Sequence, residues 1–124
     1  MFNMVDSILN FEKYKYIETK KLTSISEEIY ESHFPYFPIL PAVLLLENIK
    51  QSIELLEQSS ELNWKIKKCK KVKLYKPVHP GDVIVTSVTK ENKSEKEYYY
   101  NAVITNQDNE LVCRANKIEC NYAE

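Results

Sequence analysis

The sequence predicts an α+β domain in which one long helix packs against an antiparallel sheet. A single stretch, from Pro41 to about Gln58, has the apolar spacing of a long helix, and four strand-like runs with short connections follow Trp64. Short connections favour antiparallel pairing of successive strands. One helix and one such sheet bury both of their apolar faces only when the sheet packs onto the helix, which defines the α+β class.

The part of the chain upstream of residue 33 has weak periodicity. Lysine and tyrosine alternate over residues 13–16, and Ile25 and Ile29 follow as apolar positions. Alternation with a period of two is typical of strands. We expect short strands or an irregular approach to the helix here.

The helix is predicted from its start and from its helical wheel. Proline suits the first helical position, and neither proline nor glycine interrupts the residues that follow Pro41. On a 3.6-residue wheel the apolar stripe contains Ala42, Leu45, Leu46, Ile49, Ile53 and Leu56, and the other side contains Glu47, Lys50, Gln51, Glu54 and Gln58. Because Val43 and Leu44 make the first turns apolar almost all round, we expect a buried N-terminal half and a solvated face on the C-terminal half.

The strands after the helix are predicted from alternation and from turn residues. Val72 and Leu74 alternate with lysines, and β-branched residues dominate the run from Asp82 to Thr89. Two further runs cover about residues 97–105 and 110–121. The turn signals are Pro80-Gly81-Asp82, Glu91-Asn92-Lys93-Ser94 and Asn106-Gln107-Asp108-Asn109. We interpret Tyr98-Tyr99-Tyr100 as part of a strand that is packed on both faces.

Composition limits the classes that this chain can belong to. At 124 residues we expect one domain, 1–124, and the balance of 17 basic and 18 acidic side chains favours neither nucleic acid nor a membrane surface. The uncharged stretch from Phe34 to Leu46 is shorter than the roughly 20 residues that cross a bilayer, and nothing near the N-terminus resembles a secretory signal. We therefore expect a cytoplasmic protein. Gly81 is the only glycine, which excludes glycine-rich phosphate loops and leaves Asn, Asp or Ser for the other tight turns.

The three cysteines are expected to be reduced and at least partly buried. Cys69, Cys113 and Cys120 are odd in number, and none has the two-residue spacing of a metal knuckle or redox motif. On one continuous strand, Cys113 and Cys120 would point to opposite faces.

His33 and Glu47 are the candidate acid–base pair. An uncharged run separates them, an imidazole titrates near neutral pH, and desolvation can bring a carboxyl group into the same range. Each has an ordinary alternative: a glutamate on the polar side of a helix is often solvated, and a histidine before an aromatic-proline pair is often a turn residue. Between them, the helix start at Pro41-Ala42-Val43 offers unpaired N–H groups that can stabilise an oxyanion.

A band of lysines marks the first strand after the helix. Its members are Lys65, Lys67, Lys68, Lys70, Lys71, Lys73 and Lys76. Such a band is most often a solvated strand face or an edge that resists aggregation. Nucleic acid is the least favoured partner because no aromatic stacking platform is interleaved. Docking of an acidic protein or of a phosphate-bearing arm is the remaining interpretation, whereas His79 lies beside a turn and is expected to have no chemical role.

Two segments form a pattern that one enzyme family shares. The first contains His33-Phe34-Pro35, Pro38, Pro41, Val43-Leu44, Glu47 and Gln51. The second runs from Val72 to Asp82 and ends in the Pro-Gly-Asp turn. In this order and at this separation they resemble the β-hydroxyacyl-acyl carrier protein dehydratases, the hotdog-fold dehydratases of fatty-acid synthesis. The resemblance covers about Ile25 to the C-terminus.

The resemblance implies a fold and a set of chemical roles. The hotdog fold is a long helix wrapped by an antiparallel sheet, and it implies a homodimer, or a higher assembly of dimers, with active sites at the interface. His33 would remove the C2 proton of a 3-hydroxyacyl thioester, and Glu47 of the other subunit would protonate the departing hydroxyl. The N–H of Ala42, helped by Val43, would hold the thioester oxygen, and Gln51 would orient Glu47. No metal or redox cofactor is needed.

From this resemblance we expect a lyase that converts a 3-hydroxyacyl thioester on acyl carrier protein to the trans-2-enoyl thioester in fatty-acid biosynthesis. Phe34 and Tyr36 would lie in the substrate site, and Lys70, Lys71 and Lys73 would form a docking surface for the carrier. Two alternatives stay open. One is an acyl thioesterase on the same fold, and the other is a non-catalytic acyl-thioester-binding protein that is closed by Tyr36, where the family has glycine.

Overall fold

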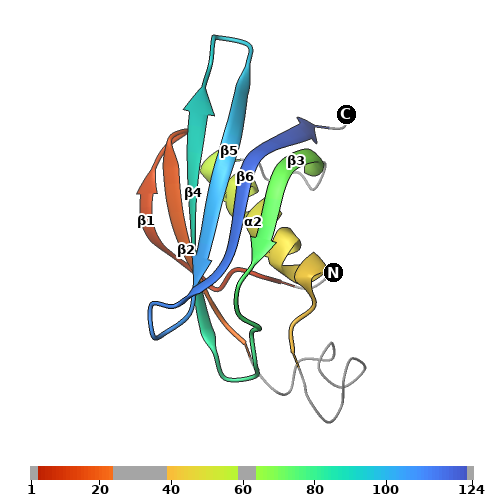
Figure 1. Ribbon diagram of the computed structural model, residues 1–124. Helices are drawn as coiled ribbons and strands as arrows, with labels where there is room; N and C mark the ends of the chain where they lie inside the picture. Colours follow the sequence, from red (N-terminus) through yellow and green to blue (C-terminus); the bar gives the residue numbers. More distant parts are fainter. Residues whose placement is uncertain (1–2, 24–38, 59–63, 123–124) are drawn as a thin grey trace.

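One helix lies across one face of a six-stranded sheet in a computed structural model of the chain, which describes residues 3–23, 39–58 and 64–122 (Figure 1). In chain order the elements are β1 (Ser7–Glu12), β2 (Tyr16–Leu22), α2 (Ala42–Leu56), β3 (Trp64–Leu74), β4 (Val83–Asn92), β5 (Tyr98–Thr105) and β6 (Leu111–Tyr122). The strands are ordered β1-β2-β4-β5-β6-β3, and all neighbours are antiparallel. The predicted α+β class is confirmed.

The two strands upstream of the helix join the same sheet. Their position differs from the prediction, because residues 13–15, part of the alternating stretch, form the turn between β1 and β2. The N–H of Lys15 donates to the carbonyl of Glu12 at 2.9 Å and closes this turn. Tyr14 has a φ of 62°, so this turn uses a tyrosine where we expected Asn, Asp or Ser. The expectation is correct for the turn before β6, where Asn109 has a φ of 60°.

The helix begins at Ala42, and Pro41 is its N-cap instead of its first helical residue. Pro41 has φ −61° and ψ 145°, an extended conformation that proline adopts readily. The expectation of a buried N-terminal half is correct for Leu44 and Leu45 and wrong for Ala42 and Val43, which are exposed. Val43 is 68% exposed, and on the helical wheel it lies opposite the stripe that faces the sheet. None of the described residues forms a helix that is long and apolar enough to span a membrane.

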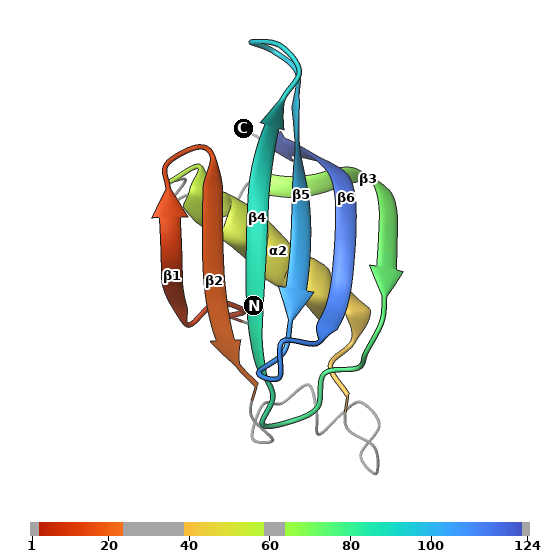
Figure 2. The same ribbon diagram turned by 60° about the vertical axis from the view of Figure 1, so that its left-hand side comes forward.

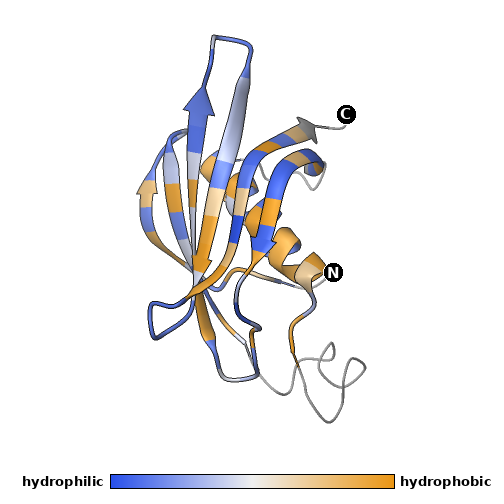
Figure 3. Ribbon diagram, in the orientation of Figure 1, coloured by the Kyte–Doolittle hydropathy of each residue, from blue (hydrophilic) through white to orange (hydrophobic). Residues whose placement is uncertain are grey.

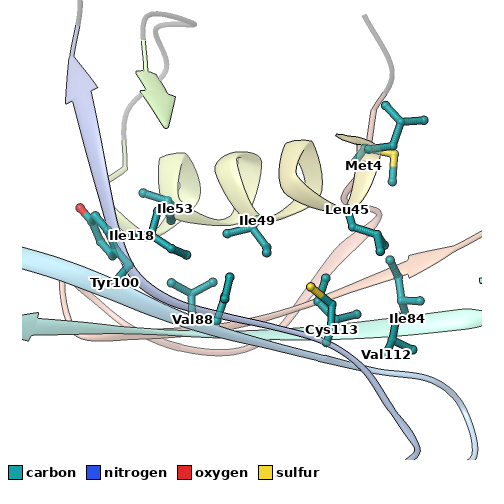
Figure 4. Close-up of a cluster of buried hydrophobic side chains, with 14 of the residues drawn as sticks. Met4, Leu45, Ile49, Ile53, Ile84, Val88, Tyr100, Val112, Cys113 and Ile118 are labelled. Carbon is teal, nitrogen blue, oxygen red and sulfur yellow. The ribbon is translucent and has the colours of Figure 1, made fainter. Parts of the chain in front are cut away.

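The core lies between α2 and the sheet. Figure 4 shows Leu45, Ile49 and Ile53 pointing from the helix toward side chains of the strands. The strand side of the core includes Ile17, Ile84, Val88, Tyr100, Ala102, Ile104, Val112, Cys113, Ala115 and Ile118. The apolar positions on the strands alternate with polar ones (Figure 3). Only Tyr100 of the three successive tyrosines is buried, so the expectation of a strand packed on both faces at this point is wrong.

A buried polar network also connects the helix to its surroundings. The Asn48 side chain donates from Nδ2 to the carbonyl of Met4 at 2.6 Å and accepts from the Thr86 hydroxyl at 2.5 Å. Ser52 donates to the carbonyl of Asn48 at 2.9 Å, so its 2.8 Å contact with Thr19 is a bond in which the Thr19 hydroxyl donates. These four polar side chains are all buried. The network therefore attaches one row of the helix to β2, β4 and the N-terminal segment.

A β-bulge in β6 changes which side chains face the helix. Tyr100 of β5 pairs with Ile118, but Ala102 pairs with Ala115, so β6 contains one extra residue between these pairs. Lys117 has a φ of 52° at this point. Because the bulge shifts the alternation by one residue, Cys113 lies in the core and Cys120 packs against it from the same side. The expectation that these cysteines point to opposite faces is wrong for this reason.

Candidate functional site

The structure places the helix part of the predicted site. Ala42, Val43, Glu47 and Gln51 lie on α2. Three other predicted site residues, His33, Phe34 and Tyr36, lie outside the described residues. The candidate acid, its neighbours and the helix start can therefore be described, and the position of the candidate base stays a prediction.

Glu47 is held in the second turn of the helix by two neighbours on the same face. Its side chain is 22% exposed. The Gln51 Nε2 donates to Glu47 Oε1 at 3.1 Å, and the Lys50 Nζ lies 3.5 Å from the same oxygen. The alternative of a solvated surface glutamate does not describe this side chain, because both neighbours restrict it and most of its surface is covered.

Gln51 is itself oriented by the N-terminal segment. The N–H of Met4 donates to Gln51 Oε1 at 2.8 Å. An amide that accepts through its oxygen from one side presents its NH₂ group to the other, which here faces Glu47. The Met4 carbonyl accepts from Asn48, so both backbone groups of Met4 bond to the helix. No pattern in the sequence indicates that the N-terminal segment contacts the helix beside the candidate acid.

Lys50 continues the row of charged residues toward the end of the helix. Its Nζ lies 3.5 Å from Oε1 of Glu54 as well as 3.5 Å from Oε1 of Glu47. Glu54 was expected on the solvated face, but it is buried. Strand β3 is one of the strands that contact α2 (Figure 2). Burial raises the pKa of Glu54, while Lys50 opposes that rise. The spacing of Glu47, Lys50 and Glu54, three and then four residues apart, was the sequence signal for this group.

A pocket of about 510 Å³ opens beside the helix start. Its lining consists of Ile39, Leu40, Pro41, Ala42 and Leu45 from one segment and Leu74, Tyr75, Lys76, Pro77 and Val78 from another. The N–H of Leu40 donates to the carbonyl of Val78 at 2.8 Å and joins the two segments. The two stretches on which the family resemblance depends therefore meet around one largely apolar pocket. Such a pocket suits an acyl chain better than a charged ligand.

All members of the lysine band except Lys76 lie on β3, which is an edge strand of the described sheet. The side chains of Lys70, Lys71 and Lys73 are exposed, and so are those of Val72 and Leu74. At the end of the band, Lys76 forms an ion pair with Glu110. The prediction that this band occupies a strand edge is correct. No group of His, Cys, Asp and Glu side chains in the described part of the chain could hold a metal ion.

The arrangement of a long helix wrapped by an antiparallel sheet is the hotdog fold. One solved structure with this fold is the dehydratase heterocomplex ApeI:P from Xenorhabdus doucetiae, with a TM-score of 0.71 and 16% identity over 92% of this chain and 96% of that one. Another is smu.793 from Streptococcus mutans bound to acetyl CoA, with a TM-score of 0.74 and 14% identity over 99% and 91% of the two chains. At these identities the likeness concerns the fold alone.

Sequence similarity identifies the family. The ApeI-like family, described as ApeI dehydratase, matches residues 10–116. The 3-hydroxyacyl-acyl-carrier-protein dehydratase FabZ of Buchnera aphidicola is 32% identical over 92% of this chain and 79% of its own length, and that of Aliivibrio fischeri is 35% identical over 96% and 82%. This chain belongs to the ApeI-like dehydratase family, which confirms the resemblance seen in the sequence.

Proposed function

We propose that this protein removes water from a 3-hydroxyacyl thioester carried on acyl carrier protein and forms the trans-2-enoyl thioester. The observation that supports this most is the meeting of the helix start with the segment after β3 around an apolar pocket, with Glu47 in the following turn. Its relatives in B. aphidicola and A. fischeri are named as dehydratases of the same substrate class.

In the proposed reaction, His33 takes the C2 proton of the substrate and Glu47 protonates the hydroxyl at C3. The electron pair of the C2–H bond becomes the C2–C3 double bond as the C3–O bond breaks, and the hydroxyl leaves as water. His33 gains one proton and Glu47 loses one, so transfer between them or through solvent restores the enzyme. The Gln51 hydrogen bond supports this role because it fixes one oxygen of Glu47 and leaves the other for the substrate.

The helix start is the proposed site for the thioester oxygen. No side-chain cap occupies it among the described residues, and the first turn contains no acidic residue. The N–H groups of Ala42 and Val43 are the proposed donors, and negative charge on the oxygen is favoured at the positive end of the helix dipole. Ala42 also lines the pocket, which supports placing the reacting end of the acyl chain beside it.

We also propose that His33 meets Glu47 of a second copy in a homodimer. β3 pairs with β6 on one side and with no other strand of the described sheet on its other side. Its exposed Val72 and Leu74 make this edge suitable for pairing with an identical strand. The side chains of Lys70, Lys71 and Lys73 are proposed to dock the acidic carrier. Charge reversal at these lysines should weaken carrier binding, and unchanged affinity would contradict the docking surface.

The reaction is tested by incubating the purified protein with 3-hydroxyacyl and enoyl thioesters and separating the products. We expect His33→Ala and Glu47→Gln each to lower kcat/KM by about 100-fold or more, because each removes a proton-transfer group. Glu91→Gln, which changes an exposed glutamate on β4, is the matched control and should keep full activity. Full activity in both site variants would refute the mechanism. Release of a free thiol would indicate a thioesterase instead.

A further inference from the structure

Lys50 lies between two carboxylates of unequal burial on the outer face of α2. Its Nζ is 3.5 Å from Oε1 of Glu47 and 3.5 Å from Oε1 of Glu54. The side chains are 14% exposed for Lys50, 22% for Glu47 and 8% for Glu54. One lysine in a largely desolvated position is therefore shared by the candidate catalytic acid and by a second acid that the mechanism does not use.

The two carboxylates depend on Lys50 to different extents. Glu47 also accepts a hydrogen bond from Gln51. Oε1 of Glu54 is buried without a hydrogen bond from the described residues, so the nearby ammonium group is its main compensation. A buried carboxylate without such compensation is strongly disfavoured. Glu54 therefore competes with Glu47 for the charge of Lys50.

The other ionisable groups near this row leave the competition unchanged. Cys120 faces it from β6, and burial, Glu54 and Glu57 raise the pKa of that thiol to about 12, so it is neutral at working pH. Glu57 has its own partners, because its carboxylate lies 3.0 and 3.2 Å from the Nζ of Lys90 and accepts from the Tyr100 hydroxyl at 3.0 Å. Among the described residues, Glu47 and Glu54 are thus the acids that Lys50 serves.

We propose that Lys50 is a positioning residue that divides its charge between Glu47 and Glu54, and that Glu54 thereby keeps Glu47 able to carry the proton it donates. A cation paired with Glu47 alone would favour the carboxylate, which has no proton to give. Glu54 weakens that pairing by attracting Lys50, which lies as close to Glu54 as to Glu47. This inference rests on the proposed function, in which Glu47 is the acid.

The test measures the titration of Glu47 directly. Protein labelled with ¹³C at the glutamate carboxyl carbons is titrated by NMR, with the Glu47 signal assigned from its loss in Glu47→Gln. We expect the midpoint for Glu47 to move down by about half a pH unit to one unit in Glu54→Gln, which leaves Lys50 to Glu47 alone, and up by about one unit in Lys50→Met, which removes the cation 3.5 Å from Glu47. Lys50→Arg, which keeps the charge, should stay close to the parent protein.

Folding and surface effects are controlled separately. Lys50→Met leaves Glu54 buried without its cation, so the double variant Lys50→Met/Glu54→Gln is measured with it. Its midpoint should lie above that of Glu54→Gln, because the two variants differ only by the loss of Lys50. Lys15→Met removes an exposed partner of Glu12 and should leave Glu47 unchanged. The inference would be overturned by a Glu47 midpoint that is the same in Glu54→Gln as in the parent, or the same in the double variant as in Glu54→Gln.

A pH profile of kcat/KM separates this inference from the proposed function. If the Glu47 midpoint moves in opposite directions as expected and activity at fixed alkaline pH falls in Glu54→Gln, both are supported. If the midpoint moves but the profile of each variant follows that of the parent, the division of charge is supported and Glu47 is not the acid. The NMR result alone therefore decides the inference.

Discussion

Replacing Asn48 by alanine should destabilise the protein by about 3 kcal/mol, although a helical wheel gives this residue no special role. The substitution removes the donor to the Met4 carbonyl at 2.6 Å and the acceptor of the Thr86 hydroxyl at 2.5 Å. Thr86 and Asn48 are both buried, so solvent does not replace these bonds. A buried group left without its partner costs about 1–3 kcal/mol, and two such groups give the stated value.

The effect of Thr86→Val should depend on whether Asn48 is present. In the parent protein this change leaves the Asn48 oxygen without its donor and should cost about 1–2 kcal/mol. In the Asn48→Ala background the hydroxyl has already lost its acceptor, so removing it should cost close to nothing. The two substitutions together should therefore be less destabilising than their sum by about 1 kcal/mol or more.

Urea denaturation at a fixed protein concentration measures these differences through the midpoint and the slope. The corresponding fall in Tm for Asn48→Ala should be about 10 °C for a domain of this size. Asn92→Ala, at an exposed position on β4, is the matched control and should change stability by less than about 0.5 kcal/mol. Additive costs for Asn48→Ala and Thr86→Val, or a cost below about 1 kcal/mol for Asn48→Ala, would refute the role of the network.

Two further predictions concern the core. In a Cys69→Ser background, the two remaining thiols should react slowly with a disulfide reagent at pH 8 and rapidly in urea, because burial raises the pKa to about 11 for Cys113 and about 12 for Cys120. The pKa of each thiol is higher in the folded protein than its ordinary value near 9. The stability that the protonated thiols contribute should therefore be lost as the pH rises from about 9 to 12. A denaturation midpoint that stays constant over that range would contradict this. Ile49→Ala should lower the free energy of unfolding by about 2–5 kcal/mol in a denaturant titration, because Ile49 is fully buried. Leu55→Ala, at an exposed position of the same helix, should lower it by less than about 1 kcal/mol. Similar losses in the two variants would contradict the packing.

The sequence predicts the regular part of this fold because local patterns determine it. The stripe that includes Leu45, Ile49 and Ile53 does face the sheet, and β4, β5 and β6 begin and end close to their predicted bounds. The Pro80-Gly81-Asp82 turn also follows the prediction, since Gly81 has a φ of 94°. In each case the period of the apolar residues or the conformational freedom of one residue was sufficient.

Features that depend on contacts between distant segments were not predictable in this way. A wheel assigns polar residues to solvent, but Asn48 and Ser52 find partners on β2, β4 and the N-terminal segment. Glu54 is buried although the wheel places it on the polar side, and its position in the sequence contains no signal for that burial. The bulge at Lys117 likewise arises from the pairing of β5 with β6, where the N–H of Lys117 donates to the Asn101 side chain.

The buried polar row also explains how Glu47 keeps its orientation. Asn48 follows Glu47 directly, so the two side chains leave the helix about 100° apart. Rotating the helix to move Glu47 would break the hydrogen bonds of Asn48 to Met4 and Thr86. Directional hydrogen bonds such as these fix the rotation of the helix more specifically than apolar contacts do. Met4 also donates to Gln51, so a displacement of the N-terminal segment would disturb the helix orientation and the Gln51 amide together. Asn48→Ala should therefore lower kcat more than its loss of stability alone explains, under conditions where the variant is still fully folded.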